Sequence, residues 1–258
     1  MKIALVGFGK MGHMIQQIAL KRGNEVVLTA DPFAPDADVK EQDSEKIAEA
    51  VKKSGAEAVI EFTHPNSVMN NINALIATDI PVIVGTTGWY AHLDDVKKAV
   101  KTNNASLFYA ANYSIGVNLF YKIVKEAAAV ISAYDEYDAA VWEAHHNQKA
   151  DSPSGTALDV AKMVMEGMKK KTELVIGNFE GRPKKEQLQV ASTRVGSVPG
   201  THIVYFDSVA DTIELTHTAR SREGFALGAV VAAEWMANGL KIGSLKKGET
   251  YTMTDLMK

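Results

Sequence analysis

The sequence predicts a two-domain protein of the α/β class, in which a parallel sheet domain is followed by a second α+β domain with a mainly antiparallel sheet. Two stretches of the chain indicate this. Through the first two-fifths, short apolar runs alternate with helical patterns, which is typical of a parallel sheet with helices on both faces. After about residue 114, two helical stretches lead to three strand-like runs joined by turns, which favours antiparallel pairing.

The first domain is expected to span residues 1–113. Its five predicted strands lie in the runs IALVG, EVVLTAD, AEAVIEFT, IPVIVGT and ASLFYAAN, and the segments SEKIAEAVKKS and HLDDVKKAVKT have helical patterns. A last helical pattern, FALGAVVAAEWMANGL, is expected to return to this domain, so that residues 222–258 complete it.

The second domain is expected to span residues 114–221, with helices in IGVNLFYKIVKEAAAVISA and near TALDVAKMVMEGM. Its predicted strands are LQVASTRVG, THIVYFDS and DTIELTHTA, joined by the turn-like segments SVPG and VADT. In the last strand, Ile213, Leu215 and His217 alternate with Glu214, Thr216 and Thr218, so one face is apolar and the other is polar.

Composition limits the classes of function. The chain has 258 residues, 46% of them hydrophobic and 23% charged, which is typical of a globular protein with one large or two modest domains. A net charge of −3 gives no support for a nucleic-acid partner, and the absence of cysteine excludes disulfides and thiolate metal sites. Neither a signal peptide nor a segment that could cross a membrane is expected, so we expect a cytoplasmic protein.

A glycine motif directly follows the first predicted strand and opens the first helix. It comprises Gly7, Phe8, Gly9, Lys10, Met11 and Gly12. Such glycines let a pyrophosphate approach the backbone at a helix N-terminus, and Asp31, at the end of the second strand, is placed to accept the ribose hydroxyls. In this context the motif predicts a Rossmann-type dinucleotide site, although turn glycines needed only for packing are the alternative.

Two further loops follow predicted strands, at the edge where parallel sheets bind ligands. The first contains Gly85, Thr86 and Thr87, and the second contains Ala110, Ala111, Asn112 and Tyr113. Small residues and hydroxyls there would suit a flat nicotinamide ring, and a tyrosine could pack near it. From spacing alone, plain turns explain the two loops equally well.

The segment EAHHNQKADSPSGTA, residues 143–157, concentrates two imidazoles, an ammonium and the start of a helix. Together with GFGKMG, VGTTGW and AANYSIGVN, it closely resembles the 4-hydroxy-tetrahydrodipicolinate reductase family, also called dihydrodipicolinate reductase. The resemblance runs essentially from end to end. It implies a nicotinamide-dependent reduction in the diaminopimelate and lysine pathway.

The resemblance also implies roles for residues of this segment. His145 becomes the general acid/base and Lys149 a second proton donor, because an imidazole can give and regain a proton near neutral pH. His146 resembles a contact to one substrate carboxylate, and Gly155 with Thr156 resembles an amide and hydroxyl site for the other. The same groups would serve the elimination of water from the hydroxylated substrate. Family members are typically tetramers assembled through the sheet of the second domain.

The sequence departs from the family pattern at three places. Ala140 stands where the pattern usually carries Glu, and we expect it to touch residues that support the site. The glycine loop is one residue shorter than the longer family form, and Pro32 follows Asp31 where another form has Arg. With Lys10 as the nearby cation, we expect NADH to be favoured and NADPH also accepted.

The remaining titratable residues carry weaker expectations. His202 and His217 are expected to be sheet residues and not ligands, His64 and His92 to be exposed, and Arg220 to contact either a carboxylate or the other domain. No histidine spacing suggests a metal site. Two alternatives stay open at this point: a protein that binds a dinucleotide only to sense it, and a different reductase on the same fold.

Overall fold

The computed structural model describes all 258 residues of the chain, which form two compact units. The first unit comprises Met1–Ser114 together with Glu223–Lys258, and the second comprises Ile115–Arg222. Because the chain leaves the first unit and returns to it, the second unit is an insertion within the first. Each unit has its own sheet and its own core.

The sheet of the first unit has six strands in the order β11-β5-β4-β3-β1-β2, all parallel. The five predicted strands are β1 (Lys2–Val6), β2 (Glu25–Ala30), β3 (Ala58–Glu61), β4 (Val82–Val84) and β5 (Ser106–Tyr109). The sixth strand, β11 (Glu249–Tyr251), was not predicted; it pairs with β5 at the edge of the sheet. This confirms the predicted Rossmann-type sheet.

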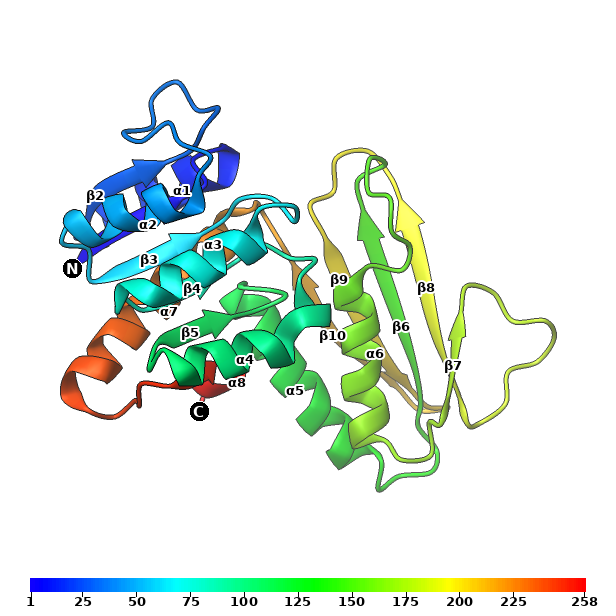
Figure 1. Ribbon diagram of the computed structural model, residues 1–258. Helices are drawn as coiled ribbons and strands as arrows, with labels where there is room; N and C mark the ends of the chain where they lie inside the picture. The colour runs from blue at the N-terminus through cyan, green and yellow to red at the C-terminus, as the bar shows by residue number, and fades with distance from the viewer. The chain divides into compact units, whose positions relative to one another are not determined.

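Helices cover both faces of this sheet, and Figure 1 shows α2, α3 and α4 together in front of it. The helices are α1 (Lys10–Lys21), α2 (Ser44–Lys53), α3 (Val68–Leu75), α4 (Leu93–Thr102), α7 (Glu223–Ile242) and α8 (Met253–Leu256), with short 3₁₀ turns at Ile76–Thr78 and Tyr90–His92. On the other face, α7 packs against α1, β3 and β4. A bidentate ion pair between Arg22 and Glu234, with nitrogen to oxygen distances of 3.0 and 2.6 Å, joins the end of α1 to α7.

One helix, α7, is long and apolar enough to cross a membrane by length and composition. By length and composition α7 departs from the expectation that no segment could cross a membrane, but a core helix passes the same test. The apolar character of α7 has a direct explanation in the fold, because its small residues are buried against the sheet. At Gly228, a Cβ atom would lie 1.7 Å from the carbonyl oxygen of Tyr113, so only glycine allows this close packing.

The second unit has a mixed sheet of five strands in the order β10-β9-β6-β8-β7. The strands are β6 (Asp138–His145), β7 (Glu173–Ile176), β8 (Gln187–Arg194), β9 (Thr201–Asp207) and β10 (Thr212–Thr218). The predicted antiparallel hairpin of β9 and β10 is confirmed. The prediction that β8 pairs with β9 through the SVPG turn was wrong. Strand β6 lies between them and pairs parallel with β8 and antiparallel with β9.

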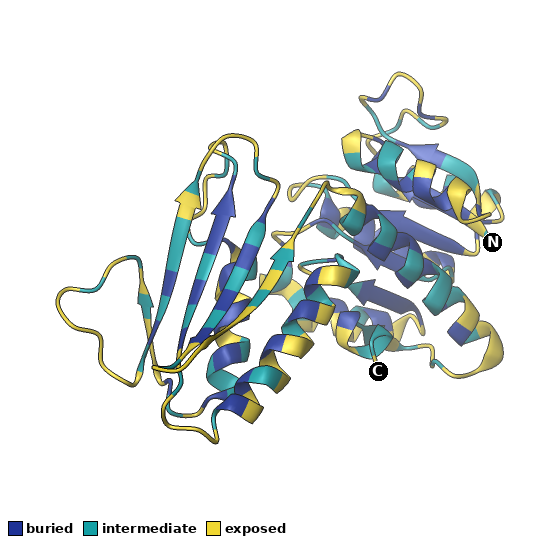
Figure 2. Cartoon of the chain, turned by 180° about the vertical axis from the view of Figure 1, so that it is seen from behind, coloured by how far each residue is buried: buried dark blue, intermediate teal, exposed yellow.

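Two helices, α5 (Ile115–Ile131) and α6 (Gly155–Gly167), cover one face of this sheet and form its core with it. Along β6, Ala139 and Val141 point into that core, whereas Ala140 and Trp142 lie on the opposite face and are half-exposed. Figure 2 shows this alternation of buried and half-buried residues along the strands of the second sheet. Since Glu143 and His145 share the face of Val141, Ala140 lies on the face away from them. The expectation that it supports the site was wrong.

Candidate active site

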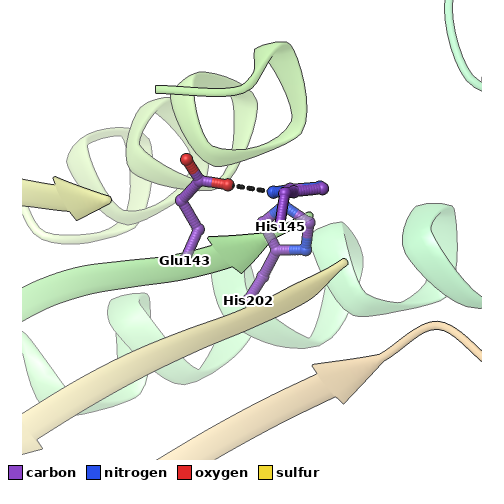
Figure 3. Close-up of side chains that lie close together, drawn as sticks. All are labelled: Glu143, His145 and His202. Carbon is purple, nitrogen blue, oxygen red and sulfur yellow. Dashed lines mark hydrogen bonds and ion pairs between the residues drawn. The ribbon is translucent and has the colours of Figure 1, made fainter. Parts of the chain in front are cut away.

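The side chains of Glu143 and His145 lie on the same face at the end of β6, since they are two residues apart in a strand. The neighbouring strands bring Arg194, at the end of β8, and His202, near the start of β9, to the same place. Figure 3 shows Glu143 pointing toward His145, with His202 beside them. The ring centroids of His145 and His202 are 5.2 Å apart.

Glu143 is fully buried, and both of its carboxylate oxygens have partners. Oε2 is hydrogen-bonded to Nδ1 of His145. Oε1 accepts from Nη2 of Arg194 at 2.8 Å and from the backbone N–H of Ser154 at 3.2 Å. One carboxylate therefore joins the imidazole, a guanidinium and the residue that precedes α6.

The charges of this group influence one another. Burial alone would raise the pKa of Glu143, but hydrogen bonds and the positive charge of Arg194 hold the pKa of this carboxyl below its ordinary value. Burial lowers the pKa of His145; Glu143 opposes this effect, and the charges of Lys149 and Arg194 add to it. Burial also lowers the pKa of His202, to about 4, so this ring is neutral at neutral pH.

Helix α6 begins at this cluster. Ser154 is its N-cap, and the Ser154 hydroxyl accepts from the backbone N–H of Ala157 at 3.1 Å, the usual arrangement at a helix start. The same hydroxyl lies 3.2 Å from Nε2 of His202. Gly155 and Thr156 form the first turn, where the positive end of the helix dipole favours an anion.

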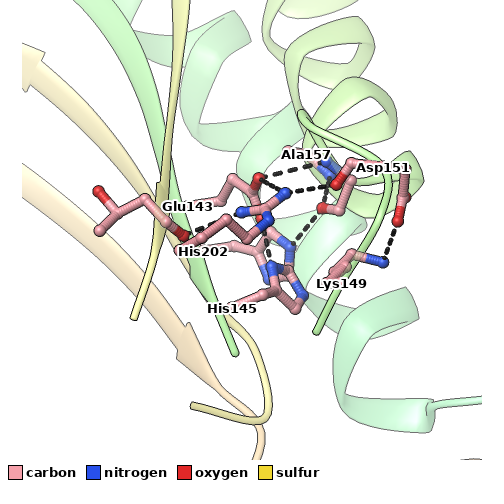
Figure 4. Close-up of polar contacts among 9 residues, drawn as sticks. Glu143, His145, Lys149, Asp151, Ala157 and His202 are labelled. Carbon is pink, nitrogen blue, oxygen red and sulfur yellow. Dashed lines mark hydrogen bonds and ion pairs between the residues drawn. The ribbon is translucent and has the colours of Figure 1, made fainter. Parts of the chain in front are cut away.

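The loop between β6 and α6 carries the other candidates, His146 and Lys149, which are both partly exposed. A turn with a 3.1 Å hydrogen bond from the Lys149 N–H to the His146 carbonyl brings them together. Nζ of Lys149 lies 2.8 Å from Oδ1 of Asp151, and this ammonium lowers the pKa of Asp151. Figure 4 marks the ion pair with a dashed line. A substrate carboxylate that binds Lys149 would have to share or displace Asp151.

The donor atoms of Glu143, His145 and His202 lie within 4.8 Å of one another, a spacing that a metal site could have. Two contacts oppose a metal here. The guanidinium of Arg194 places a positive charge 2.8 Å from the Glu143 carboxylate, and the other carboxylate oxygen is already hydrogen-bonded to His145. We therefore assign no metal to the cluster. That the reaction uses no metal stays a prediction.

The glycine motif of the first unit forms a tight turn that leads into α1. Gly7 has φ of +94°, and a Cβ there would lie 2.0 Å from the Phe62 carbonyl oxygen, so the turn requires glycine. A Cβ on Gly12 would lie 2.3 Å from the Gly7 carbonyl oxygen, whereas nothing lies within 4 Å of one on Gly9. The open backbone at Gly9, the N-cap of α1, fits the close approach of a phosphate group.

Asp31 ties the glycine loop to the segment after β2. Its Oδ2 accepts from the N–H of Phe8 at 2.8 Å, while Oδ1 accepts from Phe33 at 2.8 Å and Ala34 at 3.0 Å. Oδ2 keeps one lone pair for a ribose hydroxyl. Asp31, Pro32 and Phe33 line a cavity of ≈ 520 Å³ that also reaches Glu41, a second carboxylate.

Lys10 is exposed at the start of α1, but it is not the only cation beside Asp31. His13 lines the same hollow as Lys10 and Asp31, with its ring stacked on Phe8 at a centroid distance of 4.1 Å. Hydrogen bonds to the Gly9 carbonyl and to Asp36 raise the pKa of His13, and Nε2 lies 2.9 Å from the Asp36 carboxylate. Because Asp36 counters its charge, His13 adds little positive field for a phosphate.

The two remaining predicted loops differ in what they expose. Thr87 and Ala111 are exposed, Gly85 and Asn112 are half-exposed, and Ala110 is buried. Thr86 is buried, and its hydroxyl accepts from the N–H of Thr63 at 2.7 Å. Tyr113 is buried, and its hydroxyl donates to the Val84 carbonyl at 2.8 Å. The phenol of Tyr113 is therefore a core group, and only its backbone is left for a cofactor.

Comparison with known proteins gives a consistent result over the whole chain. Residues 1–113 match the family model described as dihydrodipicolinate reductase, N-terminus, and residues 116–257 match the model of its C-terminus. The chain belongs to the dihydrodipicolinate reductase family. This confirms the resemblance stated from the sequence motifs.

Individual members of the dihydrodipicolinate reductase family agree with this assignment. The chain is 36% identical to the 4-hydroxy-tetrahydrodipicolinate reductase of Christiangramia forsetii and 34% identical to that of Archaeoglobus fulgidus, with full coverage of all three chains. A dipicolinate-bound dihydrodipicolinate reductase from Paenisporosarcina sp. TG-14 has the same fold, with a TM-score of 0.76 over 97% of each chain at 19% identity.

Sequence reasoning missed several residues of the site. Glu143 stood in the quoted motif without a role, and Arg194 was not considered. His202 lies in a strand as expected, but its ring adjoins His145. His64 and His92 are exposed as predicted, and Arg220 lies in the exposed segment after β10. Strand order alone brings Arg194 and His202 to Glu143, and that order is not visible in local patterns.

Proposed function

We propose that this chain reduces 4-hydroxy-tetrahydrodipicolinate, by way of dihydrodipicolinate, to tetrahydrodipicolinate in the diaminopimelate and lysine pathway. One observation carries the proposal: His145, held through Nδ1, lies beside the N-terminus of α6 and the loop of Lys149. Such a group can protonate a substrate whose carboxylate rests on the helix. A protein that only senses a dinucleotide has no use for it.

A bound nicotinamide cofactor supplies the hydride, and the chain must supply the proton that accompanies it. We assign this proton to Nε2 of His145, since Nδ1 is engaged by Glu143. The ammonium of Lys149 is the second donor, and it also compensates developing negative charge. The same two groups would protonate the leaving hydroxyl when water is eliminated from the hydroxylated substrate.

Two carboxylates of the substrate need two sites for anions. We assign one to His146 and the other to the first turn of α6, where Gly155 and Thr156 present backbone N–H groups at the positive end of the helix. In this proposal the first unit binds the dinucleotide. The second unit binds the substrate and provides the contacts between subunits.

We further propose that NADH is used at least as well as NADPH. Asp31, Glu41 and Asp36 place negative charge around the expected ribose position, which disfavours a 2′-phosphate. Lys10 and the paired His13 are the nearby cations, and neither forms a bidentate fork. We also expect a cytoplasmic homotetramer without nucleic-acid or membrane partners.

An assay with the purified protein tests the function. NADH is mixed with the product of pyruvate condensation with aspartate semialdehyde, and the nicotinamide absorbance is followed. Oxidation of NADH that requires both the protein and the condensation product is expected. Binding of NADH without its oxidation would instead favour a sensor, and oxidation only with another cyclic imine would favour a different reductase.

A further inference from the structure

We propose that Glu143, kept charged by Arg194, is a positioning residue that fixes the ring of His145 and links it to the start of α6. The proposal rests on the function proposed above, because it assigns a task within that site. Glu143 stands in the quoted motif, but none of the family roles considered above is assigned to this carboxylate. What points to it is the way its two oxygens are used.

The hydrogen bond to Oε2 determines which nitrogen of His145 exchanges a proton. A carboxylate can only accept, so Nδ1 of His145 must carry hydrogen when it bonds to Glu143. In the neutral ring Nε2 is then the acceptor, and after protonation Nε2–H is the donor. Glu143 thus leaves one atom for proton transfer and prevents the ring from presenting the other.

The other oxygen, Oε1, connects His145 to the expected carboxylate site. It accepts from the backbone N–H of Ser154 at 3.2 Å, and Ser154 is the N-cap of α6. The proton-transfer group and the helix start are therefore fixed by one side chain. A displacement of Glu143 would move the imidazole of His145 relative to the start of α6. Such a shift would slow the reaction, because reacting groups tolerate little misplacement.

Arg194 makes the buried charge of Glu143 tolerable. Nη2 of Arg194 lies 2.8 Å from Oε1, and the same guanidinium donates to the carbonyls of Thr193 at 2.9 Å and Asp151 at 2.6 Å. A buried carboxylate without such a partner would bind a proton and lose its effect on the imidazole. Arg194 also ties the loop of Lys149 to the end of β8.

The charged and titratable groups facing His145 come from four elements: Glu143 on β6, Lys149 on the following loop, Arg194 on β8 and His202 on β9. Of the ionised groups, only Glu143 favours the protonated ring. Burial and the charges of Lys149 and Arg194 lower the pKa of His145, whereas Glu143 opposes them. Loss of the Glu143 charge should therefore lower this pKa further and leave less of the acid form near neutral pH.

The test compares Glu143→Gln with Glu143→Asp and with Glu166→Gln. The last variant is a matched loss of one paired carboxylate near the end of α6, where Glu166 pairs with Lys125 of α5. The pKa of His145 is measured by NMR titration of the ring in each full-length variant without ligands. Initial rates then give kcat and KM over a range of pH.

Glu143→Gln should lower the pKa of His145 and reduce kcat by about 10²-fold, the scale of a lost general acid, with little change in KM. Glu143→Asp keeps the charge but loses the hydrogen bond, so the pKa of His145 should fall less than in Glu143→Gln. Its kcat should still fall, because the shorter side chain no longer holds the ring. Glu166→Gln should change neither quantity.

An unchanged His145 pKa in Glu143→Gln would overturn the proposal, as would wild-type kcat in Glu143→Asp. If Glu143→Gln does not fold, the Asp variant still decides the matter. If the wild-type protein reduced no substrate while the His145 pKa still fell in Glu143→Gln, the proposed function would fail and the pairing of Glu143 with His145 would stand.

Discussion

Gly200 lies against the imidazole of His145, so closely that a Cβ on Gly200 would come within 2.9 Å of Nε2. Because Glu143 holds the opposite side of the ring, the ring cannot easily move away. Gly200→Ala should therefore lower kcat by about tenfold or more, since small misplacement of a reacting group is expensive. Steady-state kinetics with the condensation product measures this.

Gly196→Ala is the matched control for that change. Gly196 belongs to the same connection and has φ of +51°, but nothing lies within 4 Å of a Cβ there. Both variants should lose about 1 kcal/mol of stability from backbone strain, and only Gly200→Ala should lose turnover. Equal turnover in the two variants would show that the contact with His145 has no catalytic consequence.

His145→Ala and Lys149→Ala should each lower kcat by about 10²-fold or more, because each removes a proton donor. The fold and the binding of NADH should persist, since neither residue belongs to the first unit. Stopped-flow kinetics measures the loss of turnover, and NADH fluorescence measures cofactor binding. Lys162→Ala, an exposed lysine on α6, is the control. Near-normal turnover in both variants would remove the two residues from the mechanism.

His202 should make the protein less stable in acid. Its pKa is lowered to about 4 by burial, so the folded state binds this proton less readily than the unfolded chain does. Stability from the neutral ring is present above the ordinary pKa of about 6.5 and is lost as pH falls toward 4, by up to about 3 kcal/mol. Urea denaturation at pH 7 and pH 4.5 should show a smaller loss for His202→Gln than for wild type. Equal losses of stability in the two proteins would contradict the lowered pKa of His202.

The face of the second sheet opposite α5 and α6 should be a subunit contact. Trp142, Ile203 and Tyr205 are half-exposed there, and apolar residues on an uncovered sheet face favour assembly into closed oligomers. Trp142→Glu should dissociate the expected homotetramer at micromolar concentration, as measured by analytical ultracentrifugation. Val209→Glu, in the exposed turn before β10, should leave the assembly intact. A wild-type monomer would exclude the proposal.

Pro32→Arg should shift cofactor preference toward NADPH. Wild type should favour NADH by a few-fold, about 1 kcal/mol, because Asp31 accepts ribose hydroxyls and would repel a 2′-phosphate. Arginine at position 32, beside Asp31 in the cavity wall, would offer a bidentate partner. The measurement is kcat/KM for both cofactors at two ionic strengths, with the larger shift at low salt. A tenfold wild-type preference for NADPH would show that Asp31 is not the selector.

Local pattern was sufficient for much of the fold. The strands β1 to β5 can be recognised from their own apolar runs, and the turn before α1 from its own glycines. The edge strands β7 and β11 were missed. They are no shorter than β3 and β4, but unlike those buried strands they consist of exposed and half-exposed residues. The insertion of β6 between β8 and β9 is a long-range choice that no turn signal specifies.

The candidate site divides in the same way. His145, His146 and Lys149 lie within one motif, so the sequence alone groups them. The contact of Arg194 with Glu143 follows from the parallel register of β6 and β8, in which His145 is opposite Arg194. The burial of the Tyr113 phenol likewise depends on packing within the first unit, which hydrophobic patterning does not resolve.

The return of the chain to its first unit has a consequence for synthesis on the ribosome. Ile115–Arg222 is contiguous and can fold as soon as it emerges, whereas the first sheet still lacks α7 and β11 at that moment. Until Glu223–Lys258 arrives, the sheet surface that α7 covers stays open and is prone to aggregation. The nascent protein should therefore bind chaperones through Met1–Ser114, the part of the first unit that is synthesised first. A stop codon near the end of the gene should accordingly be more damaging than its distance from the candidate active site suggests.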